Sequence, residues 1–507
     1  MRLQYILFCI GTLLWSSCYD DLGNYDYHSI NEIKVVGGIE ERYSAYTMVD
    51  TLKISPILSF TEDSTSAERF EYSWFIAKAN FGSGKLDKIS DQKDLVYPVN
   101  LPNETYVVLF KVKDKVSEVE WSAQTSLYVT TLFTNGWMML GERDGNVSLD
   151  MVSISTVGDT MVLTDILKNS GLPVLKGPRK MISINRYYNS SSPWTTGCFL
   201  MTDDGTYELD RVSMTSGTTA NILKYMYDPE VSPDFAGSDM LQNMGYYRYM
   251  IGDNTLYVNG SLMSSGAYGN PINKYGKYDT EYFKVYPEII WGVNSWGSFS
   301  GKQMVYDMDH KRFVQFNQSS INCDTLPDNN GDVFEWKTGN EMIAVFNSKF
   351  VSSGTYTSYA IMKSPGSRWY IYSFQPASST GPKKGGKFDI TDLPDISQAT
   401  QFAFSGKYPY MLYVAGSKLH ACEFLTTGVM HKEFDEFGGD EITMLHFDTY
   451  REGGADVFYV ATYHEQNGGT VRKYRLKDDP NDIGIERIEE VNWTGLGKVT
   501  SMCWKWY

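Results

Sequence analysis

Basic residues are scarce in this 507-residue sequence, in which 45 Lys and Arg stand against 61 Asp and Glu, for a formal net charge of −16. A chain this acidic is repelled by phosphate backbones, and no basic cluster offsets the repulsion, so we expect no nucleic-acid partner. Long apolar runs are lacking as well. The N-terminal stretch YILFCIGTLLW has 11 residues, whereas a helix that spans a bilayer needs about 20.

Cysteine is rare, and its spacing excludes a compact disulfide framework. Cys9 lies in the apolar N-terminal stretch, and the chain has no CxxC pair. The cysteines that follow Cys18 are far apart in the sequence: Cys198, Cys323, Cys422 and Cys503. A chain of this length does not need disulfides, so we expect buried free thiols, with one long-range disulfide as the alternative.

Catalytic motifs are lacking too. The sequence has no HExxH, no GxSxG and no phosphate-binding loop, and none of its six histidines pair at metal-ligand spacing. Acidic pairs such as Asp203 and Asp204 are frequent, but Asp in hairpins mostly forms turns. We therefore expect a protein that is not an enzyme and has no cofactor. A glycan hydrolase or lyase is the alternative, because a sequence does not show how far apart two carboxylates lie.

The N-terminus carries an export pattern. Arg2 precedes the apolar stretch, and Ser16 and Ser17 precede Cys18, an order that resembles the bacterial lipobox except for Trp15, where Leu or Val is usual. The pattern predicts a lipoprotein signal peptide at residues 1–17 with lipid on Cys18; a plain secretory signal is the alternative. Residues 18–30 are rich in Tyr, Asp and Asn without an apolar period, which predicts a tether.

Abundant aromatic residues (15%) and 44 glycines predict an all-β protein of two domains. Residues 31–131 contain about seven short segments of β character, which is typical of a β-sandwich. We expect Trp74 in the core of this sandwich. From residue 135 onward, hairpins with DG, DN, GS or GG turns recur, as in GWMMLGERDGNVSLDMVSI and YYRYMIGDNTLYVNG.

These hairpins predict a β-propeller over residues 135–507, with seven blades favoured and six as the alternative. The C-terminal segment KVTSMCWKWY is a candidate to complete a blade begun by the strand near Trp137, which would close the ring. The segment VLTDILKNSGLP, residues 162–173, is the one helical interruption that the pattern indicates, with Thr164 as its cap.

The segments SCYDDLGNYDYHSINEI, YSWF, DLVYPVNL and GWMMLGERDG resemble the PKD-like family of surface lipoproteins from gut-type Bacteroidota. The resemblance implies a PKD-like sandwich before a propeller-like region. It also implies an accessory role beside a SusC-like TonB-dependent transporter and its SusD-like lipoprotein, in the uptake of glycan or peptide. The acidic residues after Cys18 are similar to an export signal for the outer face of the outer membrane. Membrane contact would then be through the lipid anchor alone. A purely structural subunit of the transporter complex is a further alternative.

A capture protein needs aromatic side chains on loops, because sugar rings and peptides stack on Trp and Tyr faces. Three segments fit this requirement, and their aromatic residues are our candidate ligand-binding residues: Trp291 and Trp296; Tyr187, Tyr188 and Trp194; Tyr268 and Tyr275. A separate segment, DNNGDVFEW, weakly resembles a calcium loop. Asp328, Asn330 and Asp332 would be its oxygen ligands, although the usual position-12 glutamate is absent. A solvated turn is the favoured interpretation there, and a calcium site is the alternative.

Overall fold

The computed structural model divides the chain into two compact units, Met1–Thr131 and Leu132–Tyr507, each of which is considered by itself. The structure describes residues 31–47, 50–61, 67–79, 86–133, 135–154, 160–184, 197–218, 220–227, 240–244, 247–259, 267–293, 299–317, 319–352, 355–376, 381–425, 430–447, 454–477, 479 and 482–505. No helix in these residues is long and apolar enough to cross a membrane.

The first unit is a β-sandwich with its core on one side of a five-stranded sheet in the order β2-β9-β8-β5-β6. Two further pairs of strands, β1–β4 and β3–β7, complete it. The strands are β1 Ile33–Gly37, β2 Arg42–Tyr46, β3 Thr51–Ile54, β4 Ile57–Phe60, β5 Phe70–Lys78, β6 Asp87–Ser90, β7 Leu95–Pro98, β8 Thr105–Asp114 and β9 Glu120–Thr130, with the 3-10 turn η1 at Ala67–Arg69.

Trp74 is the centre of the sandwich core, as the sequence predicted. Its side chain has no exposed surface, and its indole Nε1 donates to the carbonyl oxygen of Gln92 at 3.1 Å. Along β8 every second residue is buried, which is the pattern of a strand with one face on the core. More strands are present in the described residues than the seven or so expected, because β2 (RYSAY) and β6 (DKIS) have few buried side chains and little apolar alternation to detect.

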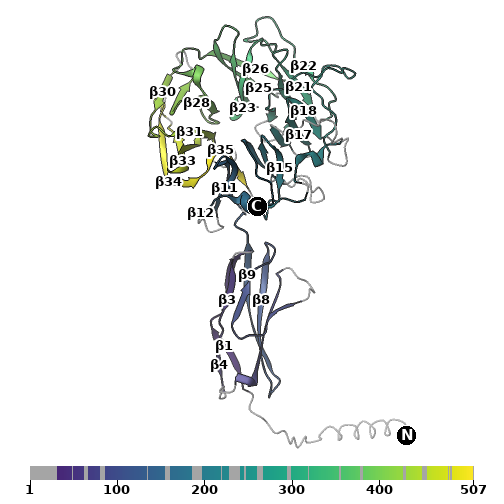
Figure 1. The fold of residues 1–507 in the computed structure, drawn as a ribbon, viewed down its shortest axis with the longest axis vertical. Helices are drawn as coiled ribbons and strands as arrows, with labels where there is room; N and C mark the ends of the chain where they lie inside the picture. Colours follow the sequence, from purple (N-terminus) through teal and green to yellow (C-terminus); the bar gives the residue numbers. More distant parts are fainter. Residues whose placement is uncertain are drawn as a thin grey trace, which may run out of the picture. The chain divides into compact units, whose positions relative to one another are not determined.

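The second unit is a β-propeller. Its described strands form seven antiparallel sheets of three or four strands, which follow one another along the chain and are arranged in a ring in Figure 1. This agrees with the seven blades favoured from the sequence. The strands are β10 Gly136–Arg143, β11 Asn146–Ile154, β12 Thr160–Leu163, β13 Pro178–Ile184, β14 Gly197–Thr202, β15 Gly205–Leu209, β16 Met240–Met244, β17 Tyr247–Gly252, β18 Thr255–Asn259, β19 Ile290–Val293, β20 Phe299–Asp307, β21 Arg312–Asn317, β22 Asp324–Thr325, β23 Glu341–Ser352, β24 Thr355–Lys363, β25 Trp369–Gln375, β26 Lys383–Asp389, β27 Gln401–Phe404, β28 Tyr410–Ala415, β29 Lys418–Glu423, β30 Met430–Phe434, β31 Glu441–Phe447, β32 Val457–His464, β33 Gly468–Leu476, β34 Ile485–Leu496 and β35 Lys498–Lys505.

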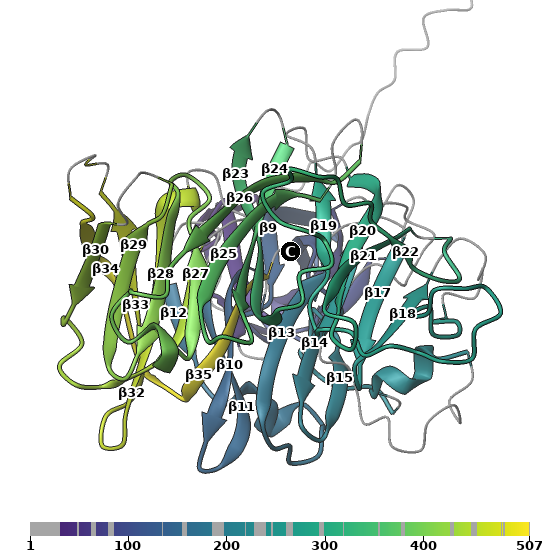
Figure 2. The ribbon, with the colours of Figure 1, turned by 90° about the horizontal axis from the view of Figure 1, so that it is seen from above.

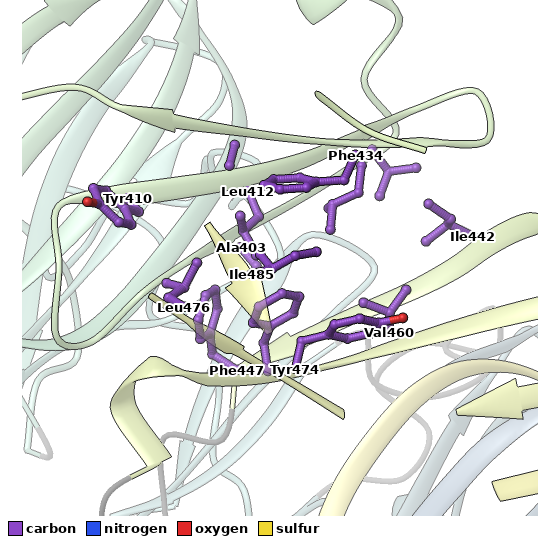
Figure 3. Packing of buried hydrophobic residues seen from close by; sticks show 14 of the residues in the cluster. Ala403, Tyr410, Leu412, Phe434, Ile442, Phe447, Val460, Tyr474, Leu476 and Ile485 are labelled. Atoms are coloured by element: carbon purple, nitrogen blue, oxygen red, sulfur yellow. The ribbon is translucent and has the colours of Figure 1, made fainter. Parts of the chain in front are cut away.

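The middle strands of the blades are buried on both faces, because each sheet packs against its neighbours on either side, whereas outer strands such as β26 alternate. All six residues of β28 are buried, whereas a half-exposed strand would alternate. Figure 2 shows β27–β30 and β31–β34 as neighbouring sheets at the yellow-green end of the chain. Between them, apolar side chains of both sheets interlock around Leu412, Val460 and Tyr474 (Figure 3).

The ring is closed by pairing between the first strand of the propeller and its last strand. The C-terminal strand β35 pairs antiparallel with β10, and Trp504 lies opposite Trp137. The two indole rings meet edge to face with centroids 5.2 Å apart. The predicted closure of the ring by the KVTSMCWKWY segment is thus confirmed.

The helical interruption is smaller than predicted. It is the 3-10 turn η2, Ile166–Asn169, and the residue at its N-cap position is Asp165 with φ 54° and no side-chain cap, so Thr164 is not the cap. The strand β12 occupies the first part of the predicted segment, since β11 supplies it with ladder partners. The other 3-10 turns of the described residues in this unit are η4 Ile222–Tyr225, η5 Ile396–Gln398 and η6 Gly454–Asp456.

Candidate functional site

Several predicted site residues lie outside the described residues: Cys18, Tyr187, Tyr188, Trp194 and Trp296. The remaining candidates fall in three different places. Trp291, Tyr268 and Tyr275 belong to the propeller blades built from β16–β18 and β19–β22, and the presumed calcium ligands lie in the segment between β22 and β23.

Trp291 belongs to a strand, in contrast to the loop position expected from the Gly, Ser and Asn residues around it. It is part of β19 and lies opposite Gln303 of β20. Its backbone N–H donates to Asn347 Oδ1 at 3.1 Å. Its half-buried side chain packs against the apolar cluster that includes Val305 and Phe316. The ring therefore contributes largely to packing between blades.

Tyr268 is a core residue. Only 2% of it is exposed, and burial raises the pKa of its hydroxyl. Its backbone pairs with Tyr225 and Tyr227 in an extended segment, so the side chain is turned into the apolar cluster around Met250. The prediction that Tyr268 presents a ring to a ligand is wrong.

The two aspartates of the candidate calcium loop are bonded to a lysine, which favours the solvated turn over a cation site. Lys384 Nζ lies 2.6 Å from Asp328 Oδ1 and 2.6 Å from Asp332 Oδ2. This contact with Lys384 holds the pKa of the Asp332 carboxyl below its usual range. Asn330 lies in an exposed turn. In the described part of the chain, no group of three or more His, Cys, Asp or Glu side chains is placed to hold a metal ion.

Tyr275 is the predicted residue around which the structure builds a surface site. Tyr275 lies in the segment between β18 and β19. The buried Asn273 ties this segment to β18 and links its first residues to Phe283. The Asn273 side chain accepts a hydrogen bond from the Leu256 N–H at 3.2 Å and donates one to the Phe283 carbonyl at 2.6 Å. Within the segment, Lys274 Nζ donates to the carbonyl oxygens of Lys277 and Asp279, at 3.1 Å each. These bonds hold an irregular segment in one conformation.

Three tyrosine rings project from this segment. Tyr278 is 85% exposed and Tyr282 is 45% exposed, while Tyr275 is half-buried against Phe283. The ammonium groups of Lys277 and Lys274 lie 5.3 and 5.5 Å from the ring centroids of Tyr278 and Tyr282, within the range of cation–π attraction. We call this site, with the neighbouring His310, the tyrosine surface.

The neighbouring turn, between β20 and β21, adds a histidine to the site. Asp307 is fully buried at the end of β20, and its Oδ1 accepts the N–H groups of Asp309 and His310 at 3.0 and 2.9 Å. Its Oδ2 accepts the Tyr275 hydroxyl and lies 2.8 Å from His310 Nδ1. One carboxylate therefore links the two segments. Burial, with the bond to Asp307, raises the pKa of the Tyr275 hydroxyl.

The two turns on either side of β21 present one apolar side chain each. Met308 and Ile321 are 40% and 45% exposed. Met308 bonds through its N–H to the Lys284 carbonyl, and Asn322 Nδ2 donates to the Tyr275 carbonyl at 2.9 Å. Both turns belong to the sheet β19–β22, whose strands β21 and β22 are labelled in Figure 1.

Of the tyrosine surface, the sequence predicted Tyr275 as a ligand-binding residue and not the other members. The spacing KYGKYDTEY places Tyr275, Tyr278 and Tyr282 at intervals of three and four, which is a detectable signal. His310 carried no such signal, because its partner Tyr275 is 35 residues away. A second missed contact joins His420 and His431, whose ring nitrogens Nδ1 and Nε2 lie 3.1 Å apart, although the histidines seemed dispersed in the sequence.

One comparison with known protein families concerns the N-terminal part of the chain. Residues 18–177 match the PKD-like family. The matched PKD-like range includes the whole sandwich and continues through β10, β11, β12 and η2 of the propeller. The resemblance to this family is thereby confirmed for that range. No curated protein matches the chain.

Three solved structures are similar in fold to this chain. A quinonprotein alcohol dehydrogenase-like protein from Bacteroides thetaiotaomicron is 13% identical, with a TM-score of 0.40 over 94% of this chain and 99% of its own. YCF48 from Cyanidioschyzon merolae is 11% identical, with a TM-score of 0.37 over 67% and 97%. PorZ, a surface component of the type-IX secretion system of Porphyromonas gingivalis, is 12% identical, with a TM-score of 0.29 over 70% and 46%. The propeller assignment itself rests on the strand pairing described above.

Proposed function

We propose that this protein is a non-catalytic lipoprotein of the cell surface that captures a nutrient ligand on its propeller, as an accessory of a SusC- and SusD-type importer. The observation that carries the proposal is the tyrosine surface. Tyr278 and Tyr282 present exposed rings on a segment that hydrogen bonds hold in place. Rings held in this way stack on a ligand with little loss of conformational freedom, and both glycans and peptides offer faces for stacking.

The anchoring part of the proposal is supported by the N-terminal sequence. The match to the PKD-like family begins at Cys18, the residue that the export pattern marks for lipidation. An anchored protein is confined beside the importer, which raises the effective concentration of any captured ligand there. Cells fed an alkyne fatty acid should label the protein, and Cys18→Ser should remove the label. Protease added to intact cells should degrade the anchored protein; its survival would contradict the outward orientation.

Ligand capture is tested by calorimetry on residues 19–507 with glycans and with peptides. We expect binding to at least one ligand, and a loss of affinity of about tenfold or more in Tyr278→Ala, since one stacked ring contributes on the order of 1–2 kcal/mol. Tyr128→Ala is the matched control, because Tyr128 is an exposed tyrosine of the sandwich (45%). No binding to any ligand, together with co-purification of a transporter, would instead support a purely structural subunit.

A second candidate function, a glycan lyase, is favoured by one observation. Tyr275, His310 and Arg312 surround the end of β20, with the Tyr275 and His310 rings 5.6 Å apart and Arg312 Cζ 6.0 Å from the Tyr275 ring. A proton donor, a proton acceptor and a cation are the groups that an elimination next to a sugar carboxylate needs. The test is release of unsaturated products from acidic polysaccharides by the wild-type protein and not by His310→Ala.

A further inference from the structure

We infer that the ligand of the tyrosine surface is a saccharide, and that Asp307 is the positioning residue that makes His310 its specificity-determining group. The inference rests on the proposed capture function and adds the chemical class of the ligand. It begins from Asp307, a carboxylate with no exposed surface. A buried carboxylate is costly unless its oxygens are all hydrogen-bonded.

The four bonds to Asp307 satisfy that requirement and fix two side chains at once. Two are backbone N–H groups of its own turn, at 3.0 and 2.9 Å. The other two come from the Tyr275 hydroxyl and the His310 ring. Asparagine could not do the same, since its side-chain NH₂ is no acceptor for a hydroxyl or an imidazole N–H. Asp307 thus ties the tyrosine segment to the β20–β21 turn.

The bond to Asp307 determines how His310 meets a ligand. Because Nδ1 faces the carboxylate at 2.8 Å, Nε2 is the ring nitrogen that is turned away from it. The side chain is 56% exposed, and its ring meets that of Tyr275 nearly at a right angle, 74°. A histidine oriented in this way by a carboxylate offers one directional hydrogen-bonding nitrogen in a fixed position.

The ring of Tyr275 lies beside His310. Together, this flat ring and the directional Nε2 of His310 complement a pyranose. The C–H face of the sugar covers a tyrosine ring, and a hydroxyl at the edge of the sugar reaches the imidazole. Tyr278 and Tyr282 are exposed on the same segment, and we expect them to contact a further sugar unit. Peptides are recognised largely through main-chain pairing with a strand edge or through apolar pockets. The segment's own polar groups at Asn273, Lys274 and Gly276 are instead bonded within it.

The experiment uses residues 19–507 and a panel of xylo-, manno-, cello-, galacto- and chito-oligosaccharides, with a random hexapeptide library as the alternative ligand. We expect one oligosaccharide series to bind and the peptides not to bind. Deoxy analogues of the bound sugar then identify the hydroxyl that matters. The wild type should lose about tenfold in affinity for one analogue, the cost of a single hydrogen bond.

His310→Ala should bind the parent sugar and that analogue equally, about tenfold more weakly than the wild type binds the parent. Asp307→Asn should lose the same discrimination, and its unfolding transition shows whether it is folded. If Asp307→Asn does not fold, His310→Ala decides the test. Gly269→Ala is the control, since an added Cβ there meets nothing within 4 Å. Unchanged discrimination in His310→Ala, or peptide binding that depends on Tyr278, would overturn the inference but leave capture intact. No binding of any probe would overturn both.

Discussion

At the scale of the residue, a buried carboxylate makes the stability of the sandwich depend on pH in the acid range. Arg69 binds Asp114 through two nitrogens, with Nε 3.0 Å from Oδ1 and Nη2 2.6 Å from Oδ2. The hydrogen bonds from Arg69 hold the pKa of Asp114 at about 2. Because the folded-state pKa lies below the usual value, the pair stabilises the fold above pH 4 or so, and this stability is lost as the pH falls toward 2.

We therefore expect the free energy of unfolding of the sandwich to fall between about pH 4 and pH 2. Asp114→Asn should cost on the order of 3 kcal/mol at neutral pH, because Arg69 loses its partner, and should remove most of the acid dependence. Calorimetry of the sandwich transition at several pH values measures both effects. Glu120→Gln breaks an exposed pair with Lys111 and should change stability little. An equally steep acid dependence in Asp114→Asn would contradict the assignment.

Lys384 makes a second prediction at this scale. Its ammonium lies between Asp328 and Asp332 and also 5.3 Å from the Trp336 ring centroid. Calcium and chelators should therefore leave the melting temperature of the propeller unchanged. Lys384→Gln should lower the melting temperature, since two carboxylates then face each other without a counter-charge. A rise in the melting temperature of the wild-type protein with calcium would contradict this reading of the loop.

At the scale of the element, the hairpin of β29 and β30 contains a pair of neutral histidines. His420 is fully buried and stacks on Tyr413 with ring centroids 4.7 Å apart. Its Nδ1 lies 3.1 Å from His431 Nε2. Burial lowers the pKa of both rings, and the neighbouring His431 lowers that of His420 further. A pKa below the usual 6.5 means that stability is complete above that pH and declines as the pH falls below it.

The propeller should thus become less stable between about pH 7 and pH 4. His420→Phe keeps a ring on Tyr413 and removes one titrating group, so its stability should depend less on pH. Some dependence should remain, because burial lowers the pKa of His446 to about 4. His464→Gln is the matched control at the exposed end of β32. Thermal unfolding across this pH range checks the prediction, and identical slopes in the wild type and His420→Phe would refute it.

The same elements show what a sequence can and cannot reveal. Turn residues such as Asp253 and Asn254, with φ of 50° and 55°, identified the β17–β18 hairpin, because few residues tolerate that conformation. The side-chain contacts depend on pairings that local patterns do not encode. Tyr268 was misjudged because its segment lies beside β18, and Trp291 because the turn-forming residues around it hid a strand. His310 meets Tyr275 only after β18, β20 and β21 have come together.

At the scale of the whole molecule, the ring depends on a contact between its first and last strands. Gly136 to Glu142 of β10 pair with Lys498 to Lys505 of β35, so the closing interactions have the largest sequence separation in the propeller. Trp504 packs against Trp137 in a cluster that includes Tyr459 and Trp493 of the last sheet, β31–β34. Loss of this strand would expose that cluster and leave β10 as an open edge.

Trp504→Ala should therefore destabilise the propeller by about 3 kcal/mol, the usual cost of removing a large buried side chain. Calorimetry should show the effect in one transition only, since the sandwich has a separate core around Trp74. Trp74→Ala is the reciprocal control and should lower only the sandwich transition, by a similar amount. A chain that ends at Gly497 should lose the propeller transition and keep that of the sandwich. If either tryptophan variant moves both transitions together, the two units fold as one cooperative body, and the independence inferred from their separate cores is refuted.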